Sequence, residues 1–132
     1  MSHTLSREIA MKRLYAETVG GTDSLSDALE QSGRDAFSDE DALFSDRLYE
    51  GVHAHLDEID KEIEAHANDW SLGRIAKVDL SILRIAVYEL LHERAIPVAV
   101  SVNEAVELAK ELGGEKSPGF INGVLGAIAK VH

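Results

Sequence analysis

The stretch that most restricts the fold of this chain is Val78–His92, with the sequence VDLSILRIAVYELLH. Its apolar residues occupy most of the circumference of a helix instead of a single stripe. A helix that is apolar nearly all round is buried among other elements, and this one is too short and too charged to span a bilayer. The sequence therefore predicts a central helix around which the rest of the chain packs.

The polar residues of this central helix fall on one edge. Ser81, Arg84, Tyr88 and His92 recur at spacings of three and four residues, which places them side by side. Two interpretations remain open for this edge. Arg84 and Tyr88 either share a hydrogen-bonded network at the margin of the core, or the edge simply faces solvent.

Helix-start and helix-stop signals divide the part of the chain before the central helix. Gly51 lies inside the longest predicted helix at a cost of ~1 kcal/mol relative to alanine, which favours close packing at that point. The predicted helices run from a cap at Thr4 or Ser6 to about Thr18, over Ser24–Gln31, from a cap at Ser38 to about His66, and over Ser71–Ala76.

Two more helices are predicted after the central one. Ser101 with Glu104 three residues later matches a capping box, and Gly113-Gly114 ends the helix that follows. Ser117 is suited to the cap of the last helix and Pro118 to its first position. The last helix has three glycines that are expected to let neighbouring helices approach closely: Gly119, Gly123 and Gly126. No segment has a strand pattern, so the predicted fold class is all-α, with about seven helices in one domain over residues 1–132.

The composition excludes several kinds of site. The chain has no cysteine, which rules out disulfides, iron–sulfur clusters, thiolate nucleophiles and cysteine-based zinc sites. The N-terminus lacks the apolar run of a signal peptide, and no stretch is long and apolar enough to span a membrane. These features are typical of a cytoplasmic protein, and we expect no cofactor.

The net charge of −11 is distributed unevenly. Residues 1–16 carry three bases and one acid, residues 17–70 carry sixteen acids and three bases, and residues 71–132 carry seven of each. A strongly acidic chain is a poor general binder of polyanions. Any nucleic acid must therefore be bound locally, by the basic N-terminus and the near-neutral C-terminal half, with the acidic middle as a solvated surface.

One pattern points to an enzyme. Two Glu-x-x-His motifs, Glu50–His53 and Glu89–His92, lie on two predicted helices, and paired motifs of this kind build carboxylate di-iron sites. Against this, the flanking helices are short, and glutamate is abundant here by composition alone. His53 and His55 are two apart on a helix, so they point in different directions and cannot share a metal. We predict no metal site and no enzymatic activity, with a di-iron protein as an alternative.

Several segments, in order along nearly the whole chain, resemble one known family. The most distinctive are DLSILRIAVYEL at Asp79–Leu90 and NEAVELAK at Asn103–Lys110. Shorter matching elements are Arg7-Glu8 with Leu14-Tyr15, Phe44 with Leu48 and Gly51-Val52, Ile59-Asp60 with Ile63, Trp70 with Arg74-Ile75, Ile96-Pro97, and FINGVL at Phe120–Leu125. Together they resemble the NusB family of bacterial transcription antitermination factors, which implies an all-helical domain of two small packed bundles.

The resemblance also implies a function. NusB proteins bind boxA, a short single-stranded RNA element of ribosomal RNA leader transcripts, together with NusE, a small-subunit ribosomal protein, and the complex makes RNA polymerase resistant to termination. Some members form homodimers that hide the RNA surface. A NusB-like domain also occurs ahead of an RNA methyltransferase, but this chain ends just after its last helix, so we expect no such domain.

The predicted RNA-binding surface combines the first and last helices. The first supplies basic side chains and Tyr15, and the amides that open the last helix suit a phosphate. Phe120 either stacks on an unpaired base or belongs to the core. The N-terminal arm lacks the several arginines usual in the family, so RNA binding by this chain alone should be weak. The predicted RNA-binding residues are Arg7, Lys12, Arg13, Tyr15, Lys116, Ser117 and Phe120.

A second surface is expected for NusE. Asp79 opens the central helix, where it either caps the helix or, by the resemblance, presents an acid to NusE. Arg74 and Lys77 belong to a ridge just before it. Besides the antitermination factor and the di-iron protein, a third possible function is that of a protein-interaction or dimer module whose RNA function has been lost. The charge of −11 and the arginine-poor arm suggest this possibility.

Overall fold

The computed structural model describes residues 3–20, 38–68 and 71–132, and the chain is all-helical within them. The all-α prediction is confirmed, with six α-helices in these residues where about seven were expected. The predicted helix at Ser24–Gln31 lies outside the described residues. No helix among those described is long and apolar enough to cross a membrane. The elements are α1 (Thr4–Thr18), α3 (Asp39–Ala54), α4 (Leu56–His66), the short 3-10 helix η2 (Leu72–Arg74), α5 (Lys77–His92), α6 (Val98–Leu112) and α7 (Ser117–Val131).

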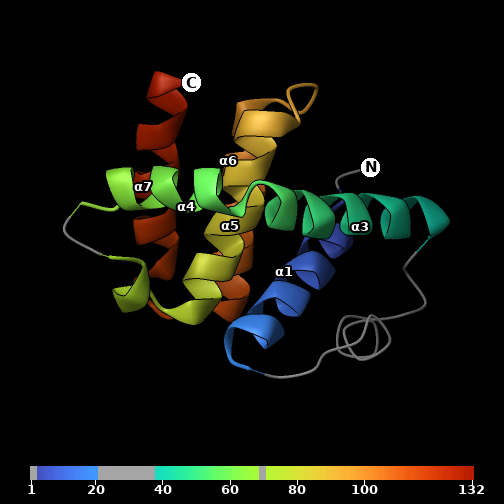
Figure 1. Ribbon diagram of the computed structural model, residues 1–132, viewed down its shortest axis with the longest axis horizontal. Coiled ribbons are helices and arrows are strands. Elements are labelled where there is room, and N and C mark those ends of the chain that lie inside the picture. The colour runs from blue at the N-terminus through green and yellow to red at the C-terminus, as the bar shows by residue number, and fades with distance from the viewer. Residues whose placement is uncertain (1–2, 21–37, 69–70) are drawn as a thin grey trace.

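Helix α5 is the centre of the fold (Figure 1), as its all-round apolar pattern predicts. It contacts each of the other five α-helices. Leu83 and Val87 are completely buried, and Ile82 and Ile85 are nearly so. Helix α1 packs on α3, and α6 packs on α7, which α4 also contacts. Two small groups of helices therefore share α5, which confirms the predicted two-bundle arrangement.

The helix predicted from Ser38 to His66 is in fact two helices. Ser38 does form a capping box, since its Oγ accepts from the Asp41 amide (3.1 Å) and its own amide donates to the Asp41 carboxylate (3.3 Å). However, α3 ends at Ala54 and α4 begins at Leu56, with His55 between them at φ −121° and ψ 24°. The apolar periodicity did not reveal this break, because the apolar faces of both helices are buried and only one residue separates them.

Three of the predicted caps were wrong for a common reason. Helix α1 follows His3 without a side-chain cap, and α6 begins at Val98, so Ser101 lies inside it. These hydroxyls make tertiary hydrogen bonds instead, which spacing along the chain does not reveal. Thr4 Oγ1 donates to Glu104 Oε1 (2.6 Å), Ser6 Oγ to the Asp41 carbonyl (3.0 Å) and Ser101 Oγ to Glu89 Oε1 (2.8 Å).

The glycine predictions had mixed outcomes. Close packing at Gly51 is confirmed, because a Cβ there would overlap the ring of Tyr88 on α5. In α7, by contrast, a Cβ at Gly119, Gly123 or Gly126 would meet no other atom within 4 Å. Close approach at those three positions was therefore a wrong prediction.

The polar edge of α5 matches neither of its two interpretations. Arg84 donates to both carboxylate oxygens of Asp60 on α4 (2.9 and 3.0 Å), while the Tyr88 hydroxyl donates to Glu93 Oε2 (2.9 Å). The two side chains thus have separate partners. Burial, reinforced by the bond to Glu93, raises the pKa of Tyr88 to about 12.

Candidate nucleic-acid interface

Two adjoining hollows lie where the end of α1, the start of α5 and the turn between α6 and α7 meet, at the lower edge of Figure 1. We call them the interface hollows. The first has a volume of about 380 Å³ and the second about 350 Å³. Seven of the ten predicted site residues line them: Arg74, Asp79, Lys116, Ser117 and Phe120 the first, and Tyr15, Lys77, Asp79 and Ser117 the second. The structure therefore brings the three predicted partner-binding residues and four of the seven predicted RNA-binding residues to one surface.

Positive charge is available at this surface. Arg74, Lys77 and Lys116 are all exposed, and none forms an ion pair within the described part of the chain. Cations that have no internal partner can bind phosphates and release the counterions that surround RNA. In a chain of net charge −11 they make a local site for a polyanion.

Asp79 is the acidic group of the interface hollows, and it is only 7% exposed. Its Oδ1 is buried and has no hydrogen-bond partner among the described residues. Helix α5 follows Ala76 without a side-chain cap, so Asp79 is not a cap, but it does lie in the first turn, where an acid complements the helix dipole. A buried acceptor without a donor costs about 1–3 kcal/mol. The carboxylate of Asp79 therefore has a hydrogen-bonding capacity that the described residues leave unused.

The start of α7 offers a smaller anion site than predicted. Ser117 is the first residue of the helix and not its cap, which is Lys116. The Ser117 amide donates to the Gly114 carbonyl (3.1 Å), and its Oγ accepts from the Gly114 amide (2.9 Å). Pro118 has no N–H. Of the first three helical residues, Gly119 alone then has an amide that can bind an anion. The charge of Lys116 therefore contributes more to anion binding than the backbone amides do.

Phe120 packs against the core, and its position also leaves the stacking prediction open. The side chain is half-buried and packs against the hydrophobic core, and it also lines the first interface hollow. A ring held on one side by the core and reachable from the other is suited to stacking on an unpaired base. Tyr15, which is 37% exposed, is a second aromatic ring in the adjoining hollow.

Arg7 was wrongly predicted as a surface contact. It is 3% exposed, and its guanidinium forms two hydrogen bonds of 2.8 Å with Glu89 on α5, whose Oε1 also accepts from Ser101. A side chain this deep has no exposed charge to offer a phosphate. Spacing along the chain could not reveal the pair, because its members are 82 residues apart.

Lys12 and Arg13 lie outside the interface hollows. Lys12 pairs with Glu8 (2.9 Å) on the same helix. Arg13 pairs with Asp46 (3.1 Å) and lies over the ring of Tyr49, 3.8 Å from its centroid. A phosphate would have to compete with a carboxylate for each of them.

The di-iron alternative is contradicted. Glu89 is held by Arg7, and His53 lies 2.8 Å from Glu17 Oε1 on α1. Glu50 is exposed on α3. The two Glu-x-x-His motifs therefore do not converge on a common centre.

Comparison with known proteins gives a consistent result. The model of the NusB family matches residues 4–130. The transcription antitermination protein NusB of Acetivibrio thermocellus is 43% identical over 136 residues, covering 99% of this chain and 90% of the relative. Among solved structures, NusB of T. maritima has a TM-score of 0.85 at 35% identity, covering 98% of this chain and 92% of that one. A crystal structure of the antitermination factors NusB and NusE in complex with dsRNA has a TM-score of 0.82 at 26% identity, covering 99% and 98%.

Proposed function

Because this chain belongs to the NusB family, we propose that it is a transcription antitermination factor that binds boxA RNA of ribosomal RNA leader transcripts together with NusE. Its relatives carry the name of a transcription factor and not of an enzyme, in agreement with the prediction of a non-enzymatic protein. In this role it acts in the cytoplasm, as part of the antitermination complex of RNA polymerase. The observation that carries the proposal is the meeting of unpaired cations and accessible aromatic rings in the interface hollows.

The RNA side of the proposal assigns different work to different residues. Lys116 binds a backbone phosphate, and Phe120 stacks on an unpaired base, with Tyr15 and Ser117 beside them. A phosphate contact contributes salt-dependent affinity, whereas stacking contributes about 1–3 kcal/mol per base with little dependence on salt. Salt titration therefore separates the two contributions.

The NusE side rests on Asp79 and the cations beside it. A ribosomal protein that binds RNA is basic, and an acidic chain attracts it over a distance. At contact, the Asp79 side chain would turn so that a donor from NusE satisfies its unpaired Oδ1, with Lys77 and Arg74 at the rim. A solved complex of NusB and NusE with dsRNA, from a structural neighbour of this chain, supports binding of both partners.

The decisive experiment measures RNA binding by fluorescence anisotropy between 50 and 200 mM salt, roughly the range over which phosphate contacts lose most of their affinity. A boxA oligomer is titrated with the protein, with and without NusE. Lys116→Gln should flatten the salt slope by about 0.7, the value for one phosphate on a single strand. Phe120→Ala should weaken binding by roughly 5- to 150-fold at every salt concentration.

The matched control for these variants is Lys110→Gln. Lys110 is an exposed lysine on α6 that pairs with Glu107 (3.0 Å), and it lies outside the interface hollows. Its replacement removes the same charge and should leave the slope unchanged. Equal effects of Lys116→Gln and Lys110→Gln would show that the RNA lies elsewhere. The same boxA sequence as a duplex tests whether the protein prefers a single strand.

A second titration tests the partner surface. Asp79→Asn should weaken NusE binding at low salt and leave the free energy of unfolding nearly unchanged, because Asp79 caps no helix. Unchanged NusE affinity would remove Asp79 from the interface. Light scattering on the same samples reports whether a homodimer competes. A stable dimer that binds neither RNA nor NusE would favour the protein-interaction module.

A further inference from the structure

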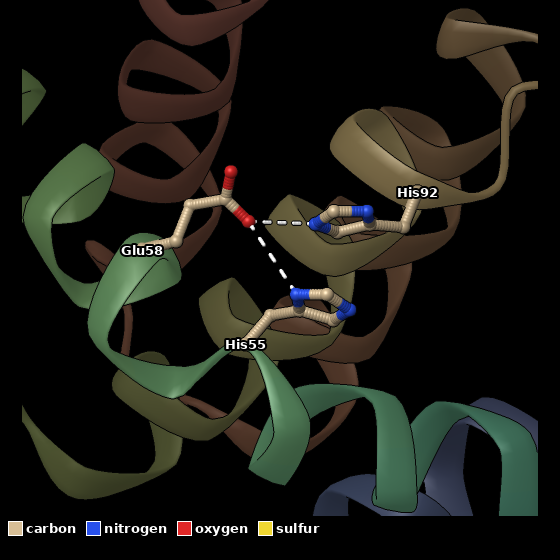
Figure 2. A group of neighbouring side chains, drawn as sticks. All are labelled: His55, Glu58 and His92. Carbon is tan, nitrogen blue, oxygen red and sulfur yellow. Dashed lines mark hydrogen bonds and ion pairs between the residues drawn. The ribbon is translucent and has the colours of Figure 1, made fainter.

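Two histidines and a glutamate converge at the junction of α3 and α4 (Figure 2). None of the three lines the interface hollows. His55 is the junction residue, Glu58 lies in the first turn of α4, and His92 is the last residue of α5. Figure 2 shows one ring nitrogen of each histidine directed at the same oxygen of Glu58. His55 Nδ1, Glu58 Oε1 and His92 Nε2 are three ligand atoms within 4.8 Å of one another.

The spacing of these atoms is close to that of a metal site. His92 Nε2 lies 2.6 Å from Glu58 Oε1, and His55 Nδ1 lies 3.8 Å from it. Zinc binds imidazole nitrogen and carboxylate oxygen at about 2.0–2.2 Å, so two ligands of a tetrahedral site are roughly 3.3–3.6 Å apart. The distance from His92 Nε2 to Glu58 Oε1 must lengthen by less than about 1 Å, and the distance from His55 Nδ1 to the same oxygen must shorten by a few tenths of an ångström. Side-chain rotation alone provides such shifts.

The two imidazoles lie face to face at this junction. Their rings are stacked, with centroids 3.8 Å apart and planes 19° apart. The ring of Tyr88 extends the stack, with its centroid 5.6 Å from that of His92. Tyr88 is itself fixed by Glu93 and packed against Gly51. Zinc lies close to the plane of each imidazole that binds it, so one ring must turn out of the stack when the ion binds, and the exposed His92 has room to do so.

The surroundings also favour a cation. The group lines an open hollow that includes Asp57, in the part of the sequence that holds sixteen acids against three bases. His53 lines the same hollow, but its Nε2 is paired with Glu17. Two neutral imidazoles and one carboxylate form a donor set that zinc accepts, with water at the remaining position.

We propose that His55, Glu58 and His92 bind one Zn²⁺ ion, which clamps the α3–α4 junction to the end of α5. The ion would fix the one residue between the two helices, where the backbone leaves the helical conformation. It would therefore stabilise the fold at a point where the chain has no continuous helix.

The test is a titration of the full-length protein with Zn²⁺, followed by calorimetry and by thermal unfolding. One equivalent should bind, and the melting temperature should rise by roughly 5–10 °C at a free Zn²⁺ concentration of about one hundred times Kd. His55→Gln, Glu58→Gln and His92→Gln should each lower the affinity about 100-fold or more, since losing even an outer partner of a metal ligand costs 10–100-fold. Glu58 is an exposed residue, so Glu58→Gln remains folded and gives a clear result.

His66→Gln is the matched control. It removes a histidine near another glutamate, Glu62, at 3.9 Å. His132 also pairs with Glu62, but these side chains form no group of three converging ligand atoms among the described residues. The control should keep both the affinity and the rise in melting temperature. Equal loss in His66→Gln and His92→Gln, binding of fewer than one equivalent, or binding without a rise in melting temperature would each overturn the proposal.

Discussion

The buried ion pair between Arg7 and Glu89 is a point at which sequence and structure make opposite predictions. From the sequence, Arg7 is a surface base whose loss should flatten the salt dependence of RNA binding. In the structure it joins α1 to α5 inside the core, 3% exposed, with both of its bonds to Glu89 at 2.8 Å. Replacing Arg7 by methionine keeps most of the side-chain volume and removes the charge.

The expected cost follows from what the substitution leaves behind. Glu89 is 1% exposed and would lose its partner, keeping the Ser101 hydroxyl at 2.8 Å as its one side-chain donor among the described residues. Removing one member of a buried ion pair costs about 3–5 kcal/mol, because the other charge stays buried without compensation. A domain of this size has a total stability of about 5–15 kcal/mol. Arg7→Met should therefore remove a large part of the stability and lower the melting temperature by roughly 10–20 °C.

Urea unfolding followed by circular dichroism measures this loss. The double variant Arg7→Met/Glu89→Met should recover most of it, since neither member of the buried pair is then charged. Glu104, which lies 3.5 Å from Arg7, is 16% exposed and keeps the Thr4 hydroxyl as a donor. Lys110→Met, at an exposed pair on α6, should cost less than about 0.5 kcal/mol. In RNA titrations on the folded protein, Arg7→Met should keep the wild-type salt slope. A loss of less than about 1 kcal/mol together with a flatter slope would refute the buried assignment and return Arg7 to the RNA surface.

Two further predictions concern packing and pH. Gly51→Ala should destabilise the protein by about 1–3 kcal/mol, because the added Cβ would overlap the Tyr88 ring. Gly123→Ala should stabilise it by roughly 0.5–1 kcal/mol, because the Cβ at that position has no neighbour within 4 Å. Both effects are measured as shifts in melting temperature. The hydrogen bond from the Ser38 amide, opposed by burial, leaves the pKa of Asp41 below its usual value. The contribution of Asp41 to the free energy of unfolding is thus complete above the unfolded pKa and is lost as the pH falls through the folded pKa. Asp41→Asn should therefore reduce the pH dependence of the unfolding free energy below about pH 4. An unchanged pH profile would contradict this.

The features that could be predicted from the sequence are those that depend on neighbouring residues. The apolar circumference of Val78–His92 predicted the central helix, since burial follows from local periodicity. Ser38 predicted its helix start, because a capping box closes within three residues. Gly51 predicted close packing, since glycine inside a helix is unfavourable unless a neighbour requires the space. The resemblance to one family along nearly the whole chain supplied the function, which spacing alone did not.

The tertiary structure alone decided the roles that depend on residues far apart in the chain. Arginine is typically a surface residue, yet Arg7 is paired with Glu89, which is 82 positions away and comes into reach only after α1 and α5 pack. Asp79 lost its capping role because the helix begins two residues earlier. His55 and His92 meet only because α3 ends at Ala54. Helical periodicity is local and survives in the sequence, whereas the pairing and desolvation of polar groups are set by the packing of whole helices.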